Sequence, residues 1–309
     1  MTEPKIVFMG TPDFSAKVLS ALAAAHPVAA VVTGTDKPVG RGYALRPSPL
    51  KVEAERLGIP VLQFDKVSRE GLDAVAALSP DLGVTAAFGQ ILSEKFLSLF
   101  PLGVINVHAS LLPKYRGASP IQWAVLDGEK ETGVTVMRTV KEVDAGDILL
   151  QKRTEIGADE TAGELFERLA VLGGEALVEA VGLIAAGRAV YTPQDAREAT
   201  HCGMIAKEDG KIDFGRTARE LDCFVRGMTP WPSAWMTVAG KRVKVFSAKP
   251  AEGSGEPGTV ISASAKTGLV VACGDGAVRL GVLRPEGKPR MSDTAWLAGH
   301  SVNAGERLQ

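Results

Sequence analysis

The sequence is poor in cysteine and has no long apolar run. Its three cysteines in 309 residues, Cys202, Cys223 and Cys273, are widely spaced and form no Cys-x-x-Cys pair, so neither a disulfide framework nor a thiolate zinc site is indicated. No apolar run approaches the roughly 20 residues that a membrane helix needs, and the N-terminus carries no signal-peptide pattern. We therefore expect a cytoplasmic, monomeric protein with reduced thiols, no metal and no membrane partner.

The glycine fingerprint of dinucleotide-binding enzymes is also missing. Residues 5–9 have an apolar strand pattern and residues 14–25 an Ala- and Leu-rich helix pattern, but only Gly10 occupies the turn between them. The G-x-G-x-x-G spacing needs two further glycines there. This opening argues against an ordinary NAD enzyme.

Neither sign of charge dominates the whole chain, yet the two signs are unevenly divided. Residues 1–205 hold 20 Lys and Arg against 25 Asp and Glu, net −5, whereas residues 206–309 hold 15 against 11, net +4. Such asymmetry predicts that the C-terminal part meets a polyanion. Chance variation on a solvated surface is the alternative explanation.

The order of the elements predicts an α/β fold followed by a small β domain. Strands alternate with helices through residues 1–189, which is typical of right-handed βαβ units in a doubly wound, mostly parallel, Rossmann-like sheet. Residues 190–206 are polar, lack periodicity and are predicted to be a linker. Residues 207–309 contain five short Val-rich segments separated by glycine turns, which predicts a β-barrel of the oligonucleotide-binding type. The helices predicted in the first part lie at residues 14–25, 49–58, 68–78, 119–126 and 161–187.

The strongest functional signal lies at the end of a strand pattern at residues 103–107. Asn106 and His108 are two residues apart, so a strand places both on one face. Burying such polar groups is costly unless they have partners or take part in chemistry. A loop follows, and then Ser119–Pro120, which is typical of a helix N-cap with proline at the first helical position. The pair is therefore expected at the carboxyl end of a strand before a crossover, where open α/β sheets bind ligands.

Residues 106–113, N-V-H-A-S-L-L-P, followed by Y-R-G at 115–117, resemble the active-site signature of the folate-dependent formyltransferases. Residues 143–148, V-D-A-G-D-I, are similar to the second motif of that family. The resemblance implies 10-formyltetrahydrofolate as the formyl donor, and Asn106, His108 and Asp144 as the catalytic residues. It also implies a folate pocket formed by Phe88, Gly89, Ile91, Ser110, Leu111, Leu112 and Pro113.

These three residue types suit an acyl transfer to an amine. The reaction passes through an oxyanion, to which the Asn106 amide can donate a hydrogen bond at no protonation cost. His108 can move a proton or stabilise charge near neutral pH. Asp144 would orient His108, and it could take the proton of the amine directly or through water. The amine itself attacks, so no Ser or Cys nucleophile is required.

The rest of the chain is most similar to the family members that formylate initiator methionyl-tRNA. Residues 34–50 hold three glycines, three prolines and three cations, which predicts a mobile basic loop. In those enzymes the equivalent loop reaches the end of the acceptor stem, so Lys37, Arg41 and Arg46 are predicted to contact tRNA. A merely flexible linker is the alternative.

A second basic group is predicted in the C-terminal part. Arg242 and Lys244 alternate onto one face of a hairpin, which together with the local positive charge predicts a surface that follows phosphates. A lysine-rich strand edge that deters aggregation would give the same pattern.

Two other functions stay open at this point. A folate-dependent formyltransferase for a small amine, such as glycinamide ribonucleotide or an amino sugar nucleotide, would share both motifs but has no obvious need for the basic loop and the barrel. An RNA-binding module with a degenerate sheet domain would have no reason to assemble Asn106, His108 and Asp144.

Overall fold

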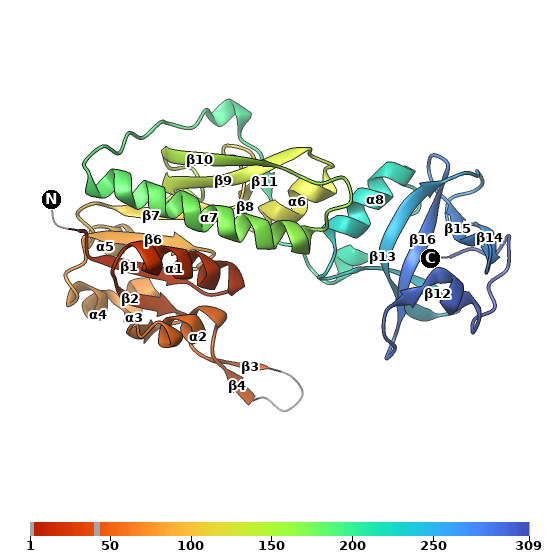
Figure 1. The fold of residues 1–309 in the computed structure, drawn as a ribbon, viewed down its shortest axis with the longest axis horizontal. Helices are drawn as coiled ribbons and strands as arrows, with labels where there is room; N and C mark the ends of the chain where they lie inside the picture. Colours follow the sequence, from red (N-terminus) through yellow and green to blue (C-terminus); the bar gives the residue numbers. More distant parts are fainter. Residues whose placement is uncertain (1–2, 40–43, 309) are drawn as a thin grey trace. The chain divides into compact units, whose positions relative to one another are not determined.

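The computed structural model describes residues 3–39 and 44–308, and the chain divides into two compact units. The first unit comprises Met1–Pro120, Glu131–Glu155 and Phe166–Cys202, and the second comprises Ile121–Lys130, Ile156–Leu165 and Gly203–Gln309. Figure 1 shows the elements of each unit, coloured along the chain.

A seven-stranded sheet forms the centre of the first unit, in the order β10-β9-β7-β6-β1-β2-β5. Its strands are β1 (Ile6–Gly10), β2 (Val28–Thr33), β5 (Val61–Gln63), β6 (Leu82–Ala86), β7 (Val104–His108), β9 (Glu131–Arg138) and β10 (Ile148–Glu155). The five strands from β7 to β5 pair in parallel, whereas β9 is antiparallel to both β7 and β10. The predicted doubly wound, mostly parallel sheet is confirmed.

Helices cover both faces of this sheet, which explains why its central strands are apolar without alternation. All five residues of β1 are buried. On one face α1 (Asp13–Ala25) meets α7 (Ala162–Ala185), where the rings of Phe14 and Phe166 lie 5.8 Å apart. On the other face, Val7 and Met9 of β1 pack in a cluster with residues of the short helices α3 (Val67–Glu70), α4 (Leu72–Ala76) and α5 (Glu94–Leu97).

The single helix predicted at residues 68–78 is wrong, because Gly71 separates α3 from α4. A Cβ atom at Gly71 would lie 2.7 Å from the ring of Phe64, so any other residue at this position would force the ring or the backbone to move. Phe64 is seven residues away, outside the spacing that helical periodicity examines. The sequence pattern therefore extended one helix through a position that tertiary packing reserves for glycine.

The loop predicted at residues 34–50 contains a short hairpin, β3 (Lys37–Val39) and β4 (Ala44–Arg46), followed by α2 (Pro49–Arg56) with Ser48 as its N-cap. The start of the hairpin is anchored by Asp36, which accepts hydrogen bonds from Gln63 Nε2 (2.7 Å) and Lys51 Nζ (2.9 Å). These bonds lower the pKa of Asp36. Lys51 is 15 positions and Gln63 is 27 positions from Asp36 in the sequence, so local composition gave no sign of this anchor.

The second unit is a curved antiparallel sheet in the order β12-β13-β16-β15-β14, with β17 on β16. Its strands are β12 (Ala234–Val238), β13 (Lys241–Ala251), β14 (Val260–Ser264), β15 (Gly268–Ala272), β16 (Ala277–Pro285) and β17 (Met291–Ser292). Helix α8 (Ala218–Gly227) begins at a capping box of Thr217 and Glu220, and packs on β13. The small C-terminal β domain predicted from the sequence is confirmed, and its sheet is antiparallel.

A buried carboxylate fixes one end of this second sheet. Asp293, at the start of α9 (Asp293–Leu297), is 1% exposed. Its oxygens accept from Arg279 Nε at 2.8 Å and from the backbone N–H groups of Leu269 (3.0 Å) and Thr294 (2.8 Å). Burial by itself would raise the pKa of Asp293, but these hydrogen bonds and the Arg279 charge outweigh it and lower the pKa below the ordinary 3.8.

Asp293→Asn is expected to lower the free energy of unfolding of the second unit by about 1.5–3 kcal/mol at pH 7, because it removes hydrogen bonds to a charged group. A lowered pKa stabilises the folded state above the ordinary value and loses that contribution as the pH falls through the folded value. The gap between wild type and variant should therefore narrow below pH 3.8. Urea unfolding, monitored through tryptophan fluorescence, measures this difference in the free energy of unfolding, since all four tryptophans lie in this unit.

The exposed Asp275, in the same unit, supplies a matched control. Asp275→Asn removes the same charge and is expected to change the free energy of unfolding by no more than about 0.5 kcal/mol. Equal stability of Asp293→Asn and wild type at pH 7 would contradict the assignment.

Candidate active site

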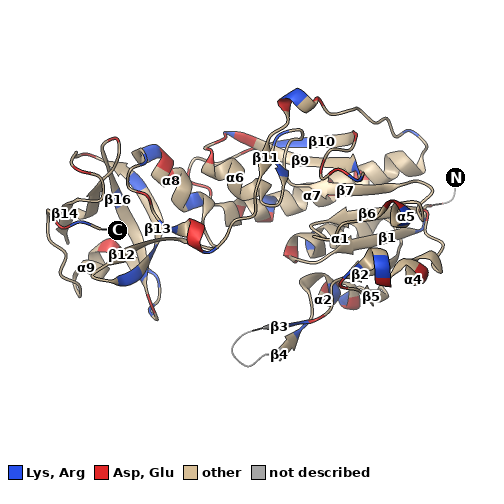
Figure 2. Cartoon of the chain, turned by 180° about the vertical axis from the view of Figure 1, so that it is seen from behind, with Lys and Arg blue, Asp and Glu red and all other residues tan. Residues whose placement is uncertain are grey.

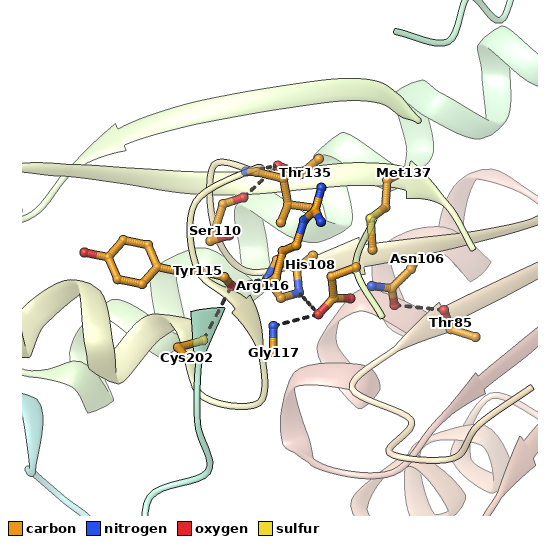
Figure 3. A network of polar contacts seen from close by, with 12 residues as sticks. Thr85, Asn106, His108, Ser110, Tyr115, Arg116, Gly117, Thr135, Met137 and Cys202 are labelled. Atoms are coloured by element: carbon orange, nitrogen blue, oxygen red, sulfur yellow. Dashed lines mark hydrogen bonds and ion pairs between the residues drawn. The ribbon is translucent and has the colours of Figure 1, made fainter. Parts of the chain in front are cut away.

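Asn106 and His108 extend from the carboxyl-terminal half of β7, on the face that the strand pattern predicts (Figure 3). β7 lies between β6 and β9, so Asn106 is flanked by Thr85 on one side and Met137 on the other. Thr85 Oγ1 donates to Asn106 Oδ1 at 2.8 Å. This bond orients the amide, and the nitrogen Nδ2 is on the side away from Thr85 in Figure 3. Asn106 therefore presents a donor rather than an acceptor on that side.

His108 is 6% exposed, and each of its ring nitrogens faces an acceptor. Nε2 lies 2.8 Å from the carbonyl oxygen of Tyr115, which can only accept, so Nε2 carries a proton. Nδ1 lies 3.6 Å from Asp144 Oδ2, an ion-pair distance that is longer than a hydrogen bond. The Asp144 carboxylate therefore lies within ion-pair reach of the ring.

Asp144 reaches this position from a tight turn between β9 and β10. The backbone N–H of Gly117 donates to Asp144 Oδ2 at 2.9 Å, which fixes the carboxylate beside His108. Asp144 has a φ of +52°, a conformation that non-glycine residues rarely adopt. At Gly146 a Cβ atom would lie 1.8 Å from the carbonyl oxygen of Arg138. The closeness of the chain in this turn accounts for the glycine in the second motif.

A cavity of about 150 Å³ lies beside these groups. It is lined by Thr85, Phe88, Gln90, Ile91, Leu92, Asn106, Met137, Arg138, Thr139, Val140, Lys141, Glu142, Val143 and Asp144. The structure thus brings Asn106 and Asp144 together at one cavity, with His108 behind Asp144. Of the residues predicted to bind folate, Phe88 and Ile91 line this cavity and Gly89 lies between them, with a φ of +69°.

Residues 110–113 do not line this cavity. Ser110 is fully buried and donates its hydroxyl to the carbonyl oxygen of Lys114 at 2.7 Å. Leu112 is 3% exposed, and the Leu112–Pro113 peptide is cis. Ser110, Leu111, Leu112 and Pro113 shape the loop between β7 and α6 (Pro120–Leu126), and direct contact between them and folate stays a prediction.

No sequence pattern indicated the wall formed by residues 138–143. This segment has no apolar periodicity, and its composition is that of an ordinary surface turn. Within it, Thr139 Oγ1 is buried and has no hydrogen-bond partner among the described residues. A buried hydroxyl without a partner is costly, so a polar group of a bound ligand would stabilise it.

Two of the predicted tRNA-binding residues of the first unit, Lys37 and Arg46, lie on the hairpin β3–β4, and Figure 2 shows the charged residues of the chain. Lys37 and Arg46 are both exposed and directly opposite one another in the hairpin. Lys37 Nζ lies 2.7 Å from Asp65 Oδ1. Like charges opposite each other destabilise a hairpin, so an anion there would be favourable. Arg41 lies outside the described residues.

In the second unit, Arg242 stacks on the ring of Trp235 at 3.8 Å, and Lys244 is half-buried. Lys244 Nζ donates to the carbonyl oxygen of Pro232 at 3.1 Å. Its pKa is lowered, first by burial and then by the surrounding cations Arg284, Arg242, Arg290 and Lys207. The two predicted residues therefore belong to a larger basic group with an aromatic ring in it.

Within residues 3–39 and 44–308, no helix is both long and apolar enough to cross a membrane. In the same described ranges, no three His, Cys, Asp or Glu side chains are grouped so that they could hold a metal ion.

Comparison with known proteins places the chain in one class, the formyl transferases. The family model described as formyl transferase matches residues 4–181, and the model described as formyl transferase, C-terminal domain, matches residues 204–301. The chain belongs to the methionyl-tRNA formyltransferase family: it is 49% identical, over 296 residues, to methionyl-tRNA formyltransferase of Macrococcus caseolyticus. That match covers 96% of this chain and 95% of the relative.

Solved structures share the fold at lower identity. HypX from Aquifex aeolicus in complex with tetrahydrofolic acid superposes with a TM-score of 0.63 at 19% identity; the match covers 96% of this chain but only 47% of HypX. Glycinamide ribonucleotide transformylase 1 from Symbiobacterium toebii gives a TM-score of 0.52 at 24% identity, over 62% of this chain and 94% of that protein.

Proposed function

We propose that this protein transfers the formyl group of 10-formyltetrahydrofolate to the α-amino group of initiator methionyl-tRNA. The observation that carries the proposal is the convergence of Asn106, His108 and Asp144 beside one cavity, in a chain whose relatives are methionyl-tRNA formyltransferases. Residues 1–189 would be the catalytic domain and residues 207–309 the tRNA-binding domain.

In the proposed reaction the amine nitrogen forms a bond to the formyl carbon, and the carbonyl oxygen becomes an oxyanion. Asn106 Nδ2 donates to that oxyanion, because Thr85 already occupies the other end of the amide. The amine proton leaves to Asp144, and the bond between the formyl carbon and N10 of the folate then breaks as Asp144 passes that proton to N10, directly or through water. The products are the N-formyl amide and tetrahydrofolate.

His108 acts through Asp144 in this mechanism. Its Nε2 is engaged by the Tyr115 carbonyl, so Nδ1 is the nitrogen that faces the Asp144 carboxylate. The ring thus keeps the carboxylate in place, where it can accept the amine proton.

The cavity suits the folate donor. It combines apolar residues such as Phe88 and Ile91 with polar groups, as cofactor-sized sites typically do. The buried Thr139 hydroxyl offers an unused hydrogen bond to a ring heteroatom or carbonyl group. HypX, which shares this fold, was solved with tetrahydrofolic acid.

Initiator methionyl-tRNA suits the basic groups of the two units. Exposed Lys37 and Arg46 on the hairpin, and Arg242 with Trp235 in the second unit, provide phosphate contacts and a surface for base stacking. A small amine acceptor would leave both groups without a role.

A direct assay tests the proposal. The protein is incubated with 10-formyltetrahydrofolate and charged initiator methionyl-tRNA, and formylmethionine is measured after deacylation. Parallel reactions contain glycinamide ribonucleotide or an amino sugar nucleotide as the acceptor. We expect formylation of methionyl-tRNA alone; formylation of a small amine alone would overturn the assignment.

Arg41→Ala is expected to raise KM for methionyl-tRNA and to reduce the dependence of kcat/KM on salt. The logarithm of a nucleic-acid binding constant falls with the logarithm of the salt concentration, and each phosphate contact contributes about 0.9 to that slope for a duplex and about 0.7 for a single strand. The affinity for folate should stay unchanged. Steady-state kinetics at salt concentrations from about 50 to about 200 mM measures both effects. Arg188→Ala removes the same charge from an exposed position just after α7 and serves as the control. An equal loss of folate affinity in Arg41→Ala would contradict its role.

A further inference from the structure

Gln194 connects two loops beside the candidate active site. It lies between α7 and β11 (His201–Cys202), and it is half-buried. Its amide nitrogen Nε2 donates to the backbone carbonyl oxygens of Asp144 (2.9 Å) and Gly146 (2.7 Å). Its oxygen Oε1 accepts from Arg116 Nε (3.1 Å) and Nη2 (2.8 Å). One side chain thus links the turn that carries Asp144 to the loop that follows β7.

The hydrogen-bonding capacity of this amide is fully used. An amide group has two N–H donors and two acceptor lone pairs, and the four short bonds of Gln194 match that number. A longer contact joins Nε2 to Met137 Sδ at 3.8 Å. Arg116 is only 5% exposed, and the carboxylate of Glu142 lies 3.6 Å from its Nη1. Removing Gln194 therefore leaves a buried guanidinium and two carbonyl groups without these partners.

The turn at Asp144 depends on outside support. Asp144 holds a positive φ, and Gly146 lies against Arg138, as described above. A strained backbone persists only when its surroundings determine it strongly. The two bonds from Gln194 go to the carbonyl groups of this turn, so they act on the backbone that sets the direction of the Asp144 side chain.

We propose that Gln194 is a positioning residue for formyl transfer. It holds the Asp144 carboxylate beside His108 Nδ1 and the cavity while contacting no substrate, since it is not among the residues that line the cavity. The inference rests on the proposed function and names a residue in the segment 190–206, whose sequence indicates no more than a linker.

A double-mutant cycle tests whether Gln194 acts through Asp144. Gln194→Ala is expected to lower kcat by about 10- to 100-fold, because misplacement of a catalytic group by about 1 Å can cost that much. KM for both substrates should change less than about 2-fold, as expected when an interaction specific to the transition state is lost. In the Asp144→Asn background, the same substitution should lower the single-turnover rate by less than about 3-fold, because coupled residues are not additive.

Two further variants separate this role from a loss of local order. Asp195→Ala changes the next residue, which pairs with the exposed Arg197 and caps the short turn of helix at Ala196–Glu198, and it should keep kcat within about 2-fold of wild type. Gln194→Glu keeps an acceptor for Arg116 but turns an acceptor toward the carbonyls of Asp144 and Gly146, so it should resemble Gln194→Ala. Thermal unfolding checks that each variant is folded.

The outcomes are distinct. If the effects of Gln194→Ala and Asp144→Asn multiply, or if Gln194→Ala raises KM with kcat unchanged, Gln194 does not act through Asp144 and this inference is overturned. If wild type does not formylate methionyl-tRNA at all, the proposed function fails instead. Non-additive loss in kcat, with Asp195→Ala close to wild type, supports the positioning role.

Discussion

Replacing Asn106 with alanine is expected to lower kcat for formyl transfer by about 100-fold or more, the usual cost of removing one oxyanion donor. The structure supplies the reason. Thr85 donates to Asn106 Oδ1, so the amide nitrogen is the group left to donate, and Asn106 lines the cavity beside Asp144. The donor costs no protonation and is already oriented before substrate binds. Its loss should therefore appear in kcat more than in KM.

The free energy of unfolding of Asn106→Ala should stay close to that of wild type, because Asn106 is only half-buried. Thr85→Val provides a matched control: it keeps the shape of the side chain and the donor on Asn106, but removes the hydrogen bond that orients the amide. We expect a smaller loss of kcat, less than about 10-fold, since the donor itself remains. Unchanged turnover in Asn106→Ala would refute the oxyanion role.

Local patterns predicted the main elements of the fold but not the contacts that hold its loops. The alternation within β7 was enough to place Asn106 and His108 on one face, because side-chain direction in a strand follows from position alone. Gly71 and the anchor at Asp36 depend on Phe64, Lys51 and Gln63, which are close in space but not in helical or strand register.

The candidate site shows the same division. Sequence spacing could not predict that Asp144 lies beside His108, because 36 positions separate them. That prediction came from the resemblance of the Asp144 motif to a known family. No pattern indicated Thr85 or Gln194. Thr85 bonds to Asn106, which is 21 positions away, and Gln194 bonds to Asp144, which is 50 positions away. Single polar residues in strands and polar segments are common, and only the folded chain reveals which of them meet.

Asp144→Asn is expected to lower kcat by about 10²- to 10⁴-fold, the range for loss of a general base. The asparagine side chain has the same shape and can still accept from the Gly117 N–H, so the turn should keep its place. It carries no negative charge, however, and cannot take the proton of the attacking amine or form an ion pair with His108. KM for methionyl-tRNA and for the folate should change little, because neither effect concerns binding of the ground state.

Asp147→Asn is the matched control for this prediction, since Asp147 belongs to the same motif but does not line the cavity. It removes the same charge three residues away and should keep kcat within about 3-fold of wild type, as surface substitutions away from a site usually do. Single-turnover measurements with enzyme in excess isolate the chemical step from product release. If Asp144→Asn and Asp147→Asn lose activity equally, the net negative charge of the turn matters rather than the carboxylate beside His108. A loss confined to Asp144→Asn ties the proton transfer to that one group.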